Sequence, residues 1–206
     1  MKIIAHRAHT LKYGENNLKA IVYSLKQEYV DGIEIDVRMT RDFKFVLNHD
    51  PFYRGHYIKN TSLKTLKKLG LDSLDEVLAT IKSDKIILIE IKEETNKYII
   101  LVAKLYRIIK KYNLNIYVFS FNYDLMNYFK RKYPFIKCGL LIGIKKNLNK
   151  INNDFDFEAI NYRHVFKKIN KLTFVWTVNS LEEFKKIKKG QNIITDRPEY
   201  FYYLIS

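Results

Sequence analysis

Titratable side chains interrupt or end four short apolar runs of this sequence. They are His6 and Arg7 in "IIAHRAHT", Glu34 and Asp36 in "IEIDV", His49 in "FVLNHD", and Glu90 and Lys92 in "LIEIK". A carboxylate inside an apolar strand is costly unless it is paired or coordinates a metal. Two interpretations follow, namely salt bridges such as Glu90 with Lys92 or Arg7, or a functional site that these runs build together.

The three carboxylates have the chemistry of a site for a hard divalent cation. Side chains two residues apart on a strand point to the same side, so Glu34 and Asp36 share a face. Neither thiolates nor clustered imidazoles accompany these two residues and Glu90. Oxygen ligands of this kind suit Mg²⁺ or Ca²⁺ rather than zinc. We therefore expect one divalent cation, Mg²⁺ or Ca²⁺.

The basic side chains complete a set that suits phosphodiester cleavage. Two imidazoles on either side of a metal can act as general acid and general base, and His6 and His49 are the candidates. Arg7 can neutralise a phosphate oxygen through its planar fork, and Lys92 can do so as a point charge. Together these residues predict metal-assisted cleavage of a phosphodiester.

Strand-like and helix-like segments alternate along the chain that must position these residues. Strands are predicted at Lys2–Arg7, Asp31–Val37, Lys85–Lys92, Ile116–Phe121, Lys137–Gly143, Phe157–Tyr162, Leu172–Val178 and Asn192–Asp196. Helices are predicted at Glu15–Tyr29, Ser73–Lys82, Asn96–Lys111, Asp124–Lys132 and Ser180–Lys188. The helix at Ser73 has the spacing of a capping box with Glu76.

One pair of strands departs from this alternation. The residues between "IEIDV" and "FVLNHD" are too few for a parallel crossover, so these runs must form a hairpin that turns near Arg41–Asp42. Pairing its arms sets Glu34 roughly opposite His49–Asp50. The other strands, with their near-continuous Ile, Val and Leu, predict an α/β fold, a (β/α)8 TIM barrel with a β-hairpin after the second strand. In such barrels the chemistry lies at the carboxyl ends of the strands. An open doubly wound sheet is the alternative, but no Gly-rich loop follows the first strand.

Length and composition favour one domain over residues 1–206. The 206 residues are 47% hydrophobic, and no apolar run approaches the ~20 residues that span a bilayer. A first strand at Lys2 leaves no room for a signal peptide. The single cysteine, Cys138, fits a reducing compartment and is expected in the core. We expect a soluble, cytoplasmic, single-domain protein, whose oligomeric state the sequence leaves open.

The chain is strongly basic, with 37 Lys and Arg against 22 Asp and Glu, a net charge of +15. Such a charge suits an anionic substrate, nucleic acid or an anionic membrane surface. Its lysines are dispersed along helical segments, so we expect no specific nucleic-acid partner and only weak, salt-sensitive binding to random sequences.

Eight pieces of the sequence, in order, resemble the glycerophosphodiester phosphodiesterase family. They are "IIAHRA", "ENN", "IEIDVRMTRDFKFVLNHD", "SLDEVL", "LIEIK", "VFSF", "VWTVN" and "IITDRPEY", and they extend from Ile3 to Tyr200. The run from Pro51 to Gly70 is short, as in compact members without a long insertion. The resemblance implies a (β/α)8 barrel of lipid and glycerol metabolism that uses a divalent cation. Its small-molecule glycerophosphodiester substrate would be hydrolysed to glycerol 3-phosphate and an alcohol.

The resemblance also implies a role for each matching residue. The metal ligands would be Glu34, Asp36 and Glu90, the acid-base pair His6 and His49, and the phosphate-binding residues Arg7 and Lys92. Glu15 would lie beside the metal or behind a ligand, and Trp176 would form part of the pocket wall.

Departures from the family pattern keep alternatives open. Ala8 stands where the family usually has Gly, and Gly14 and Asn17 replace its Pro and Thr. A catalytically weak relative is one alternative, and a basic module that binds nucleic acid or phosphate is another. The sphingomyelinase D-like toxins share the paired histidines, but they are secreted and carry disulfides. His9, His56 and His164 match nothing catalytic and are expected at the surface, with His9 the best placed to line the pocket.

Overall fold

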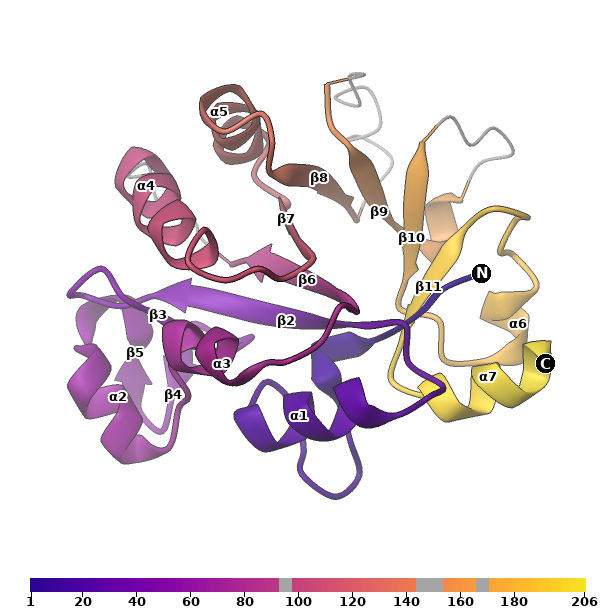
Figure 1. The fold of residues 1–206 in the computed structure, drawn as a ribbon, viewed down its shortest axis with the longest axis horizontal. Helices are drawn as coiled ribbons and strands as arrows, with labels where there is room; N and C mark the ends of the chain where they lie inside the picture. The colour runs from indigo at the N-terminus through magenta and orange to yellow at the C-terminus, as the bar shows by residue number, and fades with distance from the viewer. Residues whose placement is uncertain (93–97, 144–153, 166–170) are drawn as a thin grey trace.

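The predicted barrel is present in the computed structural model of the chain (Figure 1). The structure describes residues 1–92, 98–143, 154–165 and 171–206. Eight parallel strands of this described chain form the barrel: β1 (Ile3–Ala5), β2 (Gly32–Met39), β6 (Ile86–Ile91), β7 (Ile116–Ser120), β8 (Lys137–Ile142), β9 (Phe157–Asn161), β10 (Leu172–Trp176) and β11 (Asn192–Thr195). The sheet closes because β1 pairs with β11 on one side and with β2 on the other.

Helices follow most of the strands and cover the barrel from outside (Figure 1). They are α1 (Leu18–Lys26), α2 (Leu63–Leu69), α3 (Leu74–Thr80), α4 (Tyr98–Ile109), α5 (Tyr123–Lys132), α6 (Leu181–Phe184) and α7 (Pro198–Ile205), with the short 3₁₀ turns η1 (His6–Ala8), η2 (Ile58–Asn60) and η4 (Tyr162–His164). The outward side chains of the strands pack against the apolar faces of α1, α3, α4 and α5 in one large core cluster, whereas α7 and α2 belong to two smaller clusters. In the part of the chain that the structure describes, no helix is both long and apolar enough to cross a membrane.

The inward side chains of the strands change from apolar to acidic along the barrel. On β6, Ile86 and Leu88 belong to the inner cluster, and the next residue on that face is Glu90. On β2, the same alternation places Glu34 and Asp36 on the inner face. Aromatic rings from later strands fill the apolar level of the interior. The carboxylates therefore lie above a packed interior, toward the carboxyl ends of the strands.

The hairpin predicted after the second strand is confirmed. β3 (Phe45–Leu47) pairs antiparallel with β2, with Met39 opposite Phe45. The turn between them is closed by the Thr40 N–H, which donates to the Lys44 oxygen at 2.8 Å. A second, smaller hairpin, β4 (Phe52–Tyr53) with β5 (His56–Tyr57), was not predicted. The segment between β3 and β4 carries His49.

Two predicted boundaries were wrong at the start of the chain. The first strand ends at Ala5 rather than Arg7, because the backbone turns into η1 with Arg7 and Ala8 at φ of 53° and 49°. The helix predicted from Glu15 begins at Leu18, because the Asn17 side chain accepts a hydrogen bond from the Ala20 N–H and caps it there.

The predicted capping box at Ser73 was also wrong. Ser73 makes no side-chain cap hydrogen bond and is buried beside Val46, while Glu76 pairs with Lys67. A capping box forms instead at Ser180 and Glu183, where it starts the short helix α6. The predicted helix Ser180–Lys188 is thus shorter than expected, and the start of the one predicted at Asn96–Lys111 lies outside the described residues.

Candidate active site

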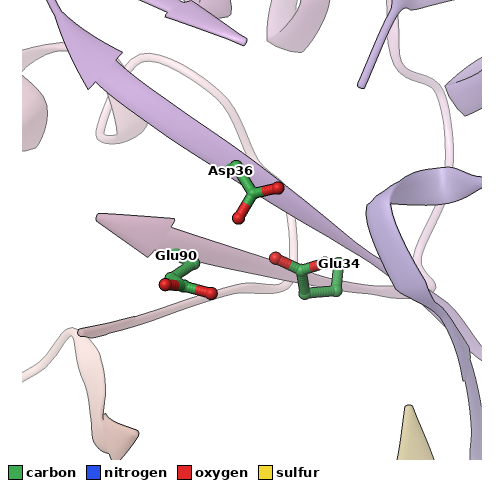
Figure 2. A group of neighbouring side chains, drawn as sticks. All are labelled: Glu34, Asp36 and Glu90. Atoms are coloured by element: carbon green, nitrogen blue, oxygen red, sulfur yellow. The ribbon is translucent and has the colours of Figure 1, made fainter. Parts of the chain in front are cut away.

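Three buried carboxylates from two neighbouring strands form the centre of the site (Figure 2). Asp36 on β2 is in register with Glu90 on β6, and Glu34 lies on the same face of β2. One oxygen from each carboxylate lies within 4.8 Å of the others. Their exposed fractions are 2% for Glu34, 1% for Asp36 and 7% for Glu90. The structure therefore brings together the three predicted metal ligands.

Burial and mutual repulsion act on the protonation of this cluster. Burial, followed by the charges of Asp36 and Glu90, raises the pKa of Glu34 well above its ordinary value. Burial also raises the pKa of Glu90 to about 7, although the adjacent Lys92 ammonium opposes the shift. Without a further positive charge, the ionised cluster is electrostatically unfavourable.

The donor set fits a hard divalent cation. Within the described chain, the buried Oε1 of Glu34 has no hydrogen-bond partner. A buried polar atom without a partner is rare and calls for an ion, a water or a strain explanation. Carboxylate oxygens are ligands that Mg²⁺ and Ca²⁺ prefer. Glu34, Asp36 and Glu90 are thus able to hold such an ion.

Two cations border the carboxylates, as the sequence predicted. The Nζ atom of Lys92 lies 2.6 Å from Glu90 Oε1 and 3.2 Å from Asp36 Oδ1. Burial would lower the pKa of Lys92, but the charges of Asp36 and Glu90 outweigh it and raise this pKa. The Arg7 Nε atom lies 3.4 Å from Asp36 Oδ2, and its Nη1 donates to Glu15 Oε1 at 2.9 Å. The salt-bridge interpretation is therefore correct for Glu90 and Lys92. The same Glu90 also belongs to the cluster of three carboxylates.

The η1 turn aims the backbone of Arg7 at the carboxylates. Its N–H donates to Glu34 Oε2 at 2.8 Å, and this contact depends on the left-handed conformation of Arg7. Ala8 follows in the same conformation and is fully buried in the outer core, where its oxygen accepts a hydrogen bond from the Ser24 hydroxyl. The methyl group that distinguishes Ala8 from glycine therefore packs into the core.

Asn16 is a site residue that the sequence analysis missed. Its Nδ2 donates to Asp36 Oδ2 at 2.8 Å, and its Oδ1 accepts from the Asp36 N–H at 2.9 Å. Glu15, predicted to lie beside the metal or behind a ligand, lies half exposed against the Arg7 guanidinium, which in turn approaches Asp36. The signal for Asn16 in the sequence was the run "GENN", in which a role was predicted for Glu15 but not for the asparagine that follows it.

His6 is held from behind by an aspartate at the other end of the chain. Its Nδ1 lies 2.7 Å from Asp196 Oδ1, and its Nε2 lies 4.0 Å from Glu34 Oε2. Asn179 donates to Asp196 Oδ2 at 2.6 Å and accepts from the Asp196 N–H at 2.9 Å. Burial would raise the pKa of Asp196, but the hydrogen bond and charge of His6 outweigh it and lower this pKa. Asp196 therefore stays ionised and fixes the imidazole.

Asn179 and Asp196 lie in the matching pieces "VWTVN" and "IITDRPEY", but no role was predicted for them. His9, which was expected at the surface or the pocket, lines a cavity of about 400 Å³ together with Asp196.

Cys138 is buried as expected, and burial raises the pKa of its thiol to about 12.

His49 lies at the rim of the site. Its Nδ1 is 2.8 Å from Asp50 Oδ1, and its oxygen accepts from Arg38 Nε and Nη2 at 2.9 and 2.6 Å. Arg38 also donates from Nη1 to the Lys92 oxygen at 2.8 Å, which ties the His49 segment to the end of β6. Among the described residues no hydrogen bond or ion pair joins His49 to the carboxylates. His49 instead shares a cavity of about 520 Å³ with Arg7 and other rim residues.

Trp176 forms an aromatic wall at the barrel mouth. Its Nε1 donates to the Ala159 oxygen at 3.0 Å, and its ring meets the half-exposed Phe121 ring edge to face at 5.8 Å. A Cβ atom at Gly143 would lie 2.9 Å from the Phe121 ring, which would have to shift to accommodate it. The predicted place of Trp176 in a pocket wall stays a prediction.

Comparisons with known proteins agree on one family. A model described as the glycerophosphoryl diester phosphodiesterase family matches residues 6–163. A glycerophosphodiester phosphodiesterase of Caldanaerobacter subterraneus is 29% identical over 98% of this chain and 97% of the relative. The crystal structure of a glycerophosphodiester phosphodiesterase from Thermotoga maritima superposes with a TM-score of 0.82 at 28% identity, covering 98% and 97% of the two chains. A phosphodiesterase from Oleispira antarctica, solved in complex with the product sn-glycerol-3-phosphate, gives 0.84 at 19% identity, covering 100% and 96%.

Proposed function

This chain belongs to the glycerophosphoryl diester phosphodiesterase family and is a phosphoric diester hydrolase, and from that premise we propose how it works. We propose that it cleaves glycerophosphodiesters to glycerol 3-phosphate and an alcohol, with one divalent cation, Mg²⁺ or Ca²⁺. The Oleispira relative holds that product. The observation that carries the proposal is the unpartnered Glu34 oxygen in a buried acidic cluster beside His6.

The carboxylates Glu34, Asp36 and Glu90 would hold the cation. Bound there, the cation would withdraw electron density from the phosphate oxygens and balance the charge of the cluster. Asn16 orients Asp36 through two hydrogen bonds, and the Arg7 N–H orients Glu34. These contacts leave the remaining oxygens of the cluster for the ion.

Arg7 and Lys92 bind the phosphate of the substrate. The Arg7 guanidinium lies between Glu15 and Asp36, and the Lys92 ammonium lies between Asp36 and Glu90. Both cations are therefore fixed beside the cluster before a phosphodiester arrives. Hydrogen bonds from Arg7 and Lys92 to the non-bridging oxygens would neutralise the charge that grows during attack at phosphorus.

His6 and His49 move the two protons that the reaction needs. The attacking oxygen, from water or from the neighbouring glycerol hydroxyl, loses a proton as it bonds to phosphorus. Attack by the hydroxyl would give a cyclic phosphate, which a water would then open to glycerol 3-phosphate. The bond to the alcohol then breaks, and the alkoxide accepts a proton. With Asp196 ionised, the shared proton resides on Nδ1 of His6, which leaves Nε2 facing the carboxylates for transfer. Asp50 holds Nδ1 of His49 in the same way.

The test is a panel of glycerophosphodiesters with different head groups, assayed with Mg²⁺, Ca²⁺ and Mn²⁺. Release of glycerol 3-phosphate is the readout, after prior removal of metal with a chelator. We expect activity only after a divalent cation is restored, with a bell-shaped pH profile whose limbs belong to the histidine pair. Full activity in excess chelator would contradict the metal assignment. Inactivity on the whole panel would favour a catalytically weak relative.

A further inference from the structure

Two short loops beside the site each expose a large apolar side chain. Finger 1 is residues 10–14, in which Thr10 and Gly14 exchange backbone hydrogen bonds of 2.8 and 2.9 Å. The Tyr13 N–H also donates to Thr10 Oγ1 at 2.9 Å. At its tip the Leu11 side chain is fully exposed, at 102%. The hydrogen bonds fix the loop, so Leu11 is held away from the protein.

Finger 2 is the β4–β5 hairpin, residues 52–57. Arg54 and Gly55 adopt positive φ values of 46° and 79°, as in the tight turns that favour two-residue hairpins. Phe52 is 56% exposed and contacts the Tyr57 ring with centroids 4.4 Å apart. Like finger 1, this loop holds an apolar side chain outward on a defined backbone.

Both fingers contribute to the lining of the same entrance. The cavity of about 520 Å³ at the rim is lined by Tyr13 from finger 1 and by Tyr53 from finger 2. Arg7 and His49 line it as well, so the entrance leads to residues of the proposed site. A surface that contacts both fingers would therefore lie next to this entrance.

Each finger combines its exposed apolar side chain with tyrosine and a cation. Lys12 Nζ lies 5.1 Å from the Tyr13 ring centroid, and Arg54 Cζ lies 5.5 Å from that of Tyr53. Neither finger contains Asp or Glu, and the whole chain carries +15. Apolar side chains that insert, tyrosines that sit at the lipid–water boundary and cations that meet anionic headgroups together suit an anionic bilayer.

We propose that the two fingers dock the catalytic face of the protein onto an anionic phospholipid bilayer. Leu11 and Phe52 insert among the lipids, and Lys12 and Arg54 meet the headgroups. The entrance that both fingers line then lies next to the lipid surface. Substrates within reach include glycerophosphodiesters that an acyl chain keeps in the membrane, and this last consequence rests on the proposed hydrolysis.

The test is co-sedimentation of the full chain with phosphatidylcholine vesicles prepared with and without phosphatidylglycerol. We expect binding to the anionic vesicles that weakens with salt. Leu11→Ser and Phe52→Ser should each reduce it about tenfold, since each removes most of one inserted apolar side chain. The matched control is Phe135→Ser, because Phe135 is 68% exposed but follows α5, at the end of the barrel opposite the fingers.

Vesicle binding and turnover are measured separately. The finger variants should hydrolyse water-soluble glycerophosphocholine as the wild type does, since neither side chain is part of the site. Failure of the wild type to bind anionic vesicles would overturn the docking proposal. So would finger variants that bind as well as the wild type, or a Phe135→Ser variant that loses as much. Inactivity of the wild type on every soluble glycerophosphodiester would instead contradict the proposed function.

Discussion

His6 and His49 each place Nδ1 against an aspartate oxygen, at 2.7 and 2.8 Å, yet their surroundings differ. The His6 side chain is 22% exposed, and its aspartate lies 190 residues away on the adjoining strand end. His49 is 39% exposed, and its partner is the next residue, itself 75% exposed. One half of the site is built on strands and fixed from several directions. The other half is built on loops and depends on one local contact.

This difference shows how one site can combine a rigid part with an adaptable part. The strand-built half, with Glu34, Asp36, Glu90 and His6, resists displacement because packed strands position it. The loop-built half, with His49, borders the entrance where a substrate arrives. We expect substitutions in the first half to have large effects and comparable substitutions in the second half to have smaller ones.

The largest effect is expected from Asp36→Asn. The change removes one charge from the cluster at nearly constant shape, so cation affinity and activity should fall together while folding is retained. We expect a loss beyond the roughly 10⁴-fold upper range of general acid-base catalysis. Calorimetric titration with Mg²⁺ and glycerol 3-phosphate release measure the two quantities. Glu15→Gln, on the exposed side of Arg7, is the matched control, and equal losses in both variants would refute the division into halves.

Replacing the histidines compares the two halves directly. His6→Ala and His49→Ala should both cost between about 10²- and 10⁴-fold on glycerophosphocholine, with the larger loss for His6→Ala. A nitrophenolate leaves almost without a proton, so loss of the general acid should matter far less on a nitrophenyl ester. Loss of the general base should matter equally on both substrates. We expect one variant, and not both, to regain activity on the nitrophenyl ester.

The two substrates also show when this assignment is wrong. Equal losses for both variants on both substrates would mean that neither histidine is a dedicated acid. A variant that binds the divalent cation poorly would have to be excluded first, by the same calorimetric titration.

The partner aspartates should show the contrast at a smaller scale. Asp196→Asn disturbs the tautomer of His6 and should lower kcat by about 10–100-fold with little change in KM, as residues that orient a functional histidine do. Asp50→Asn should cost only a few-fold, because its pair with His49 is exposed. The pH profile of the Asp196 variant should shift as well. A larger loss for Asp50→Asn than for Asp196→Asn would reverse the comparison.

The smallest expected effect is on the pH dependence of stability without metal. Burial raises the pKa of Glu34 and Glu90, the latter from 4.5 to about 7, so the native state binds more protons than the unfolded state between these values. The free energy of unfolding should therefore fall as pH rises through this window. Asp50 and Asp196 have lowered pKa values, so their stabilising contributions are lost only at lower pH.

Thermal melts in chelator and in Mg²⁺ measure this dependence. Because a bound cation favours the ionised carboxylates, Mg²⁺ should reduce the change of the free energy of unfolding with pH. Glu90→Gln should reduce the same pH dependence when chelator is present. A metal-free protein that becomes more stable toward pH 7 would contradict the assigned direction.

The sequence was sufficient for those features that repeat along a strand. The two-residue spacing of Glu34 and Asp36 placed both carboxylates on one face, and the short link after Val37 required a hairpin. The predicted barrel is confirmed. It could be predicted because alternating strands and helices form few other folds. Each of these inferences used neighbours in the chain.

Other features depend on contacts between residues far apart in the chain or on an unusual backbone conformation. These features were not predictable in the same way. Asp196 is placed behind His6 by barrel closure, and nothing in the local sequence indicates the contact. Ser73 had the right residue type for a capping box, but packing against Val46 buries it. The left-handed turn at Arg7 and Ala8 runs against the ordinary preference of both residues.

The closure of the barrel also sets an order of events during protein synthesis. The three carboxylates of the acidic cluster lie within the first half of the chain, on strands that are direct neighbours. β1 can pair with β11 only much later, because Asp196, at the end of β11, follows His6 by 190 residues. A nascent chain can thus assemble its acidic cluster well before His6 acquires its partner. Catalysis that depends on the His6–Asp196 pair is therefore expected only after β11 has been synthesised and has paired with β1.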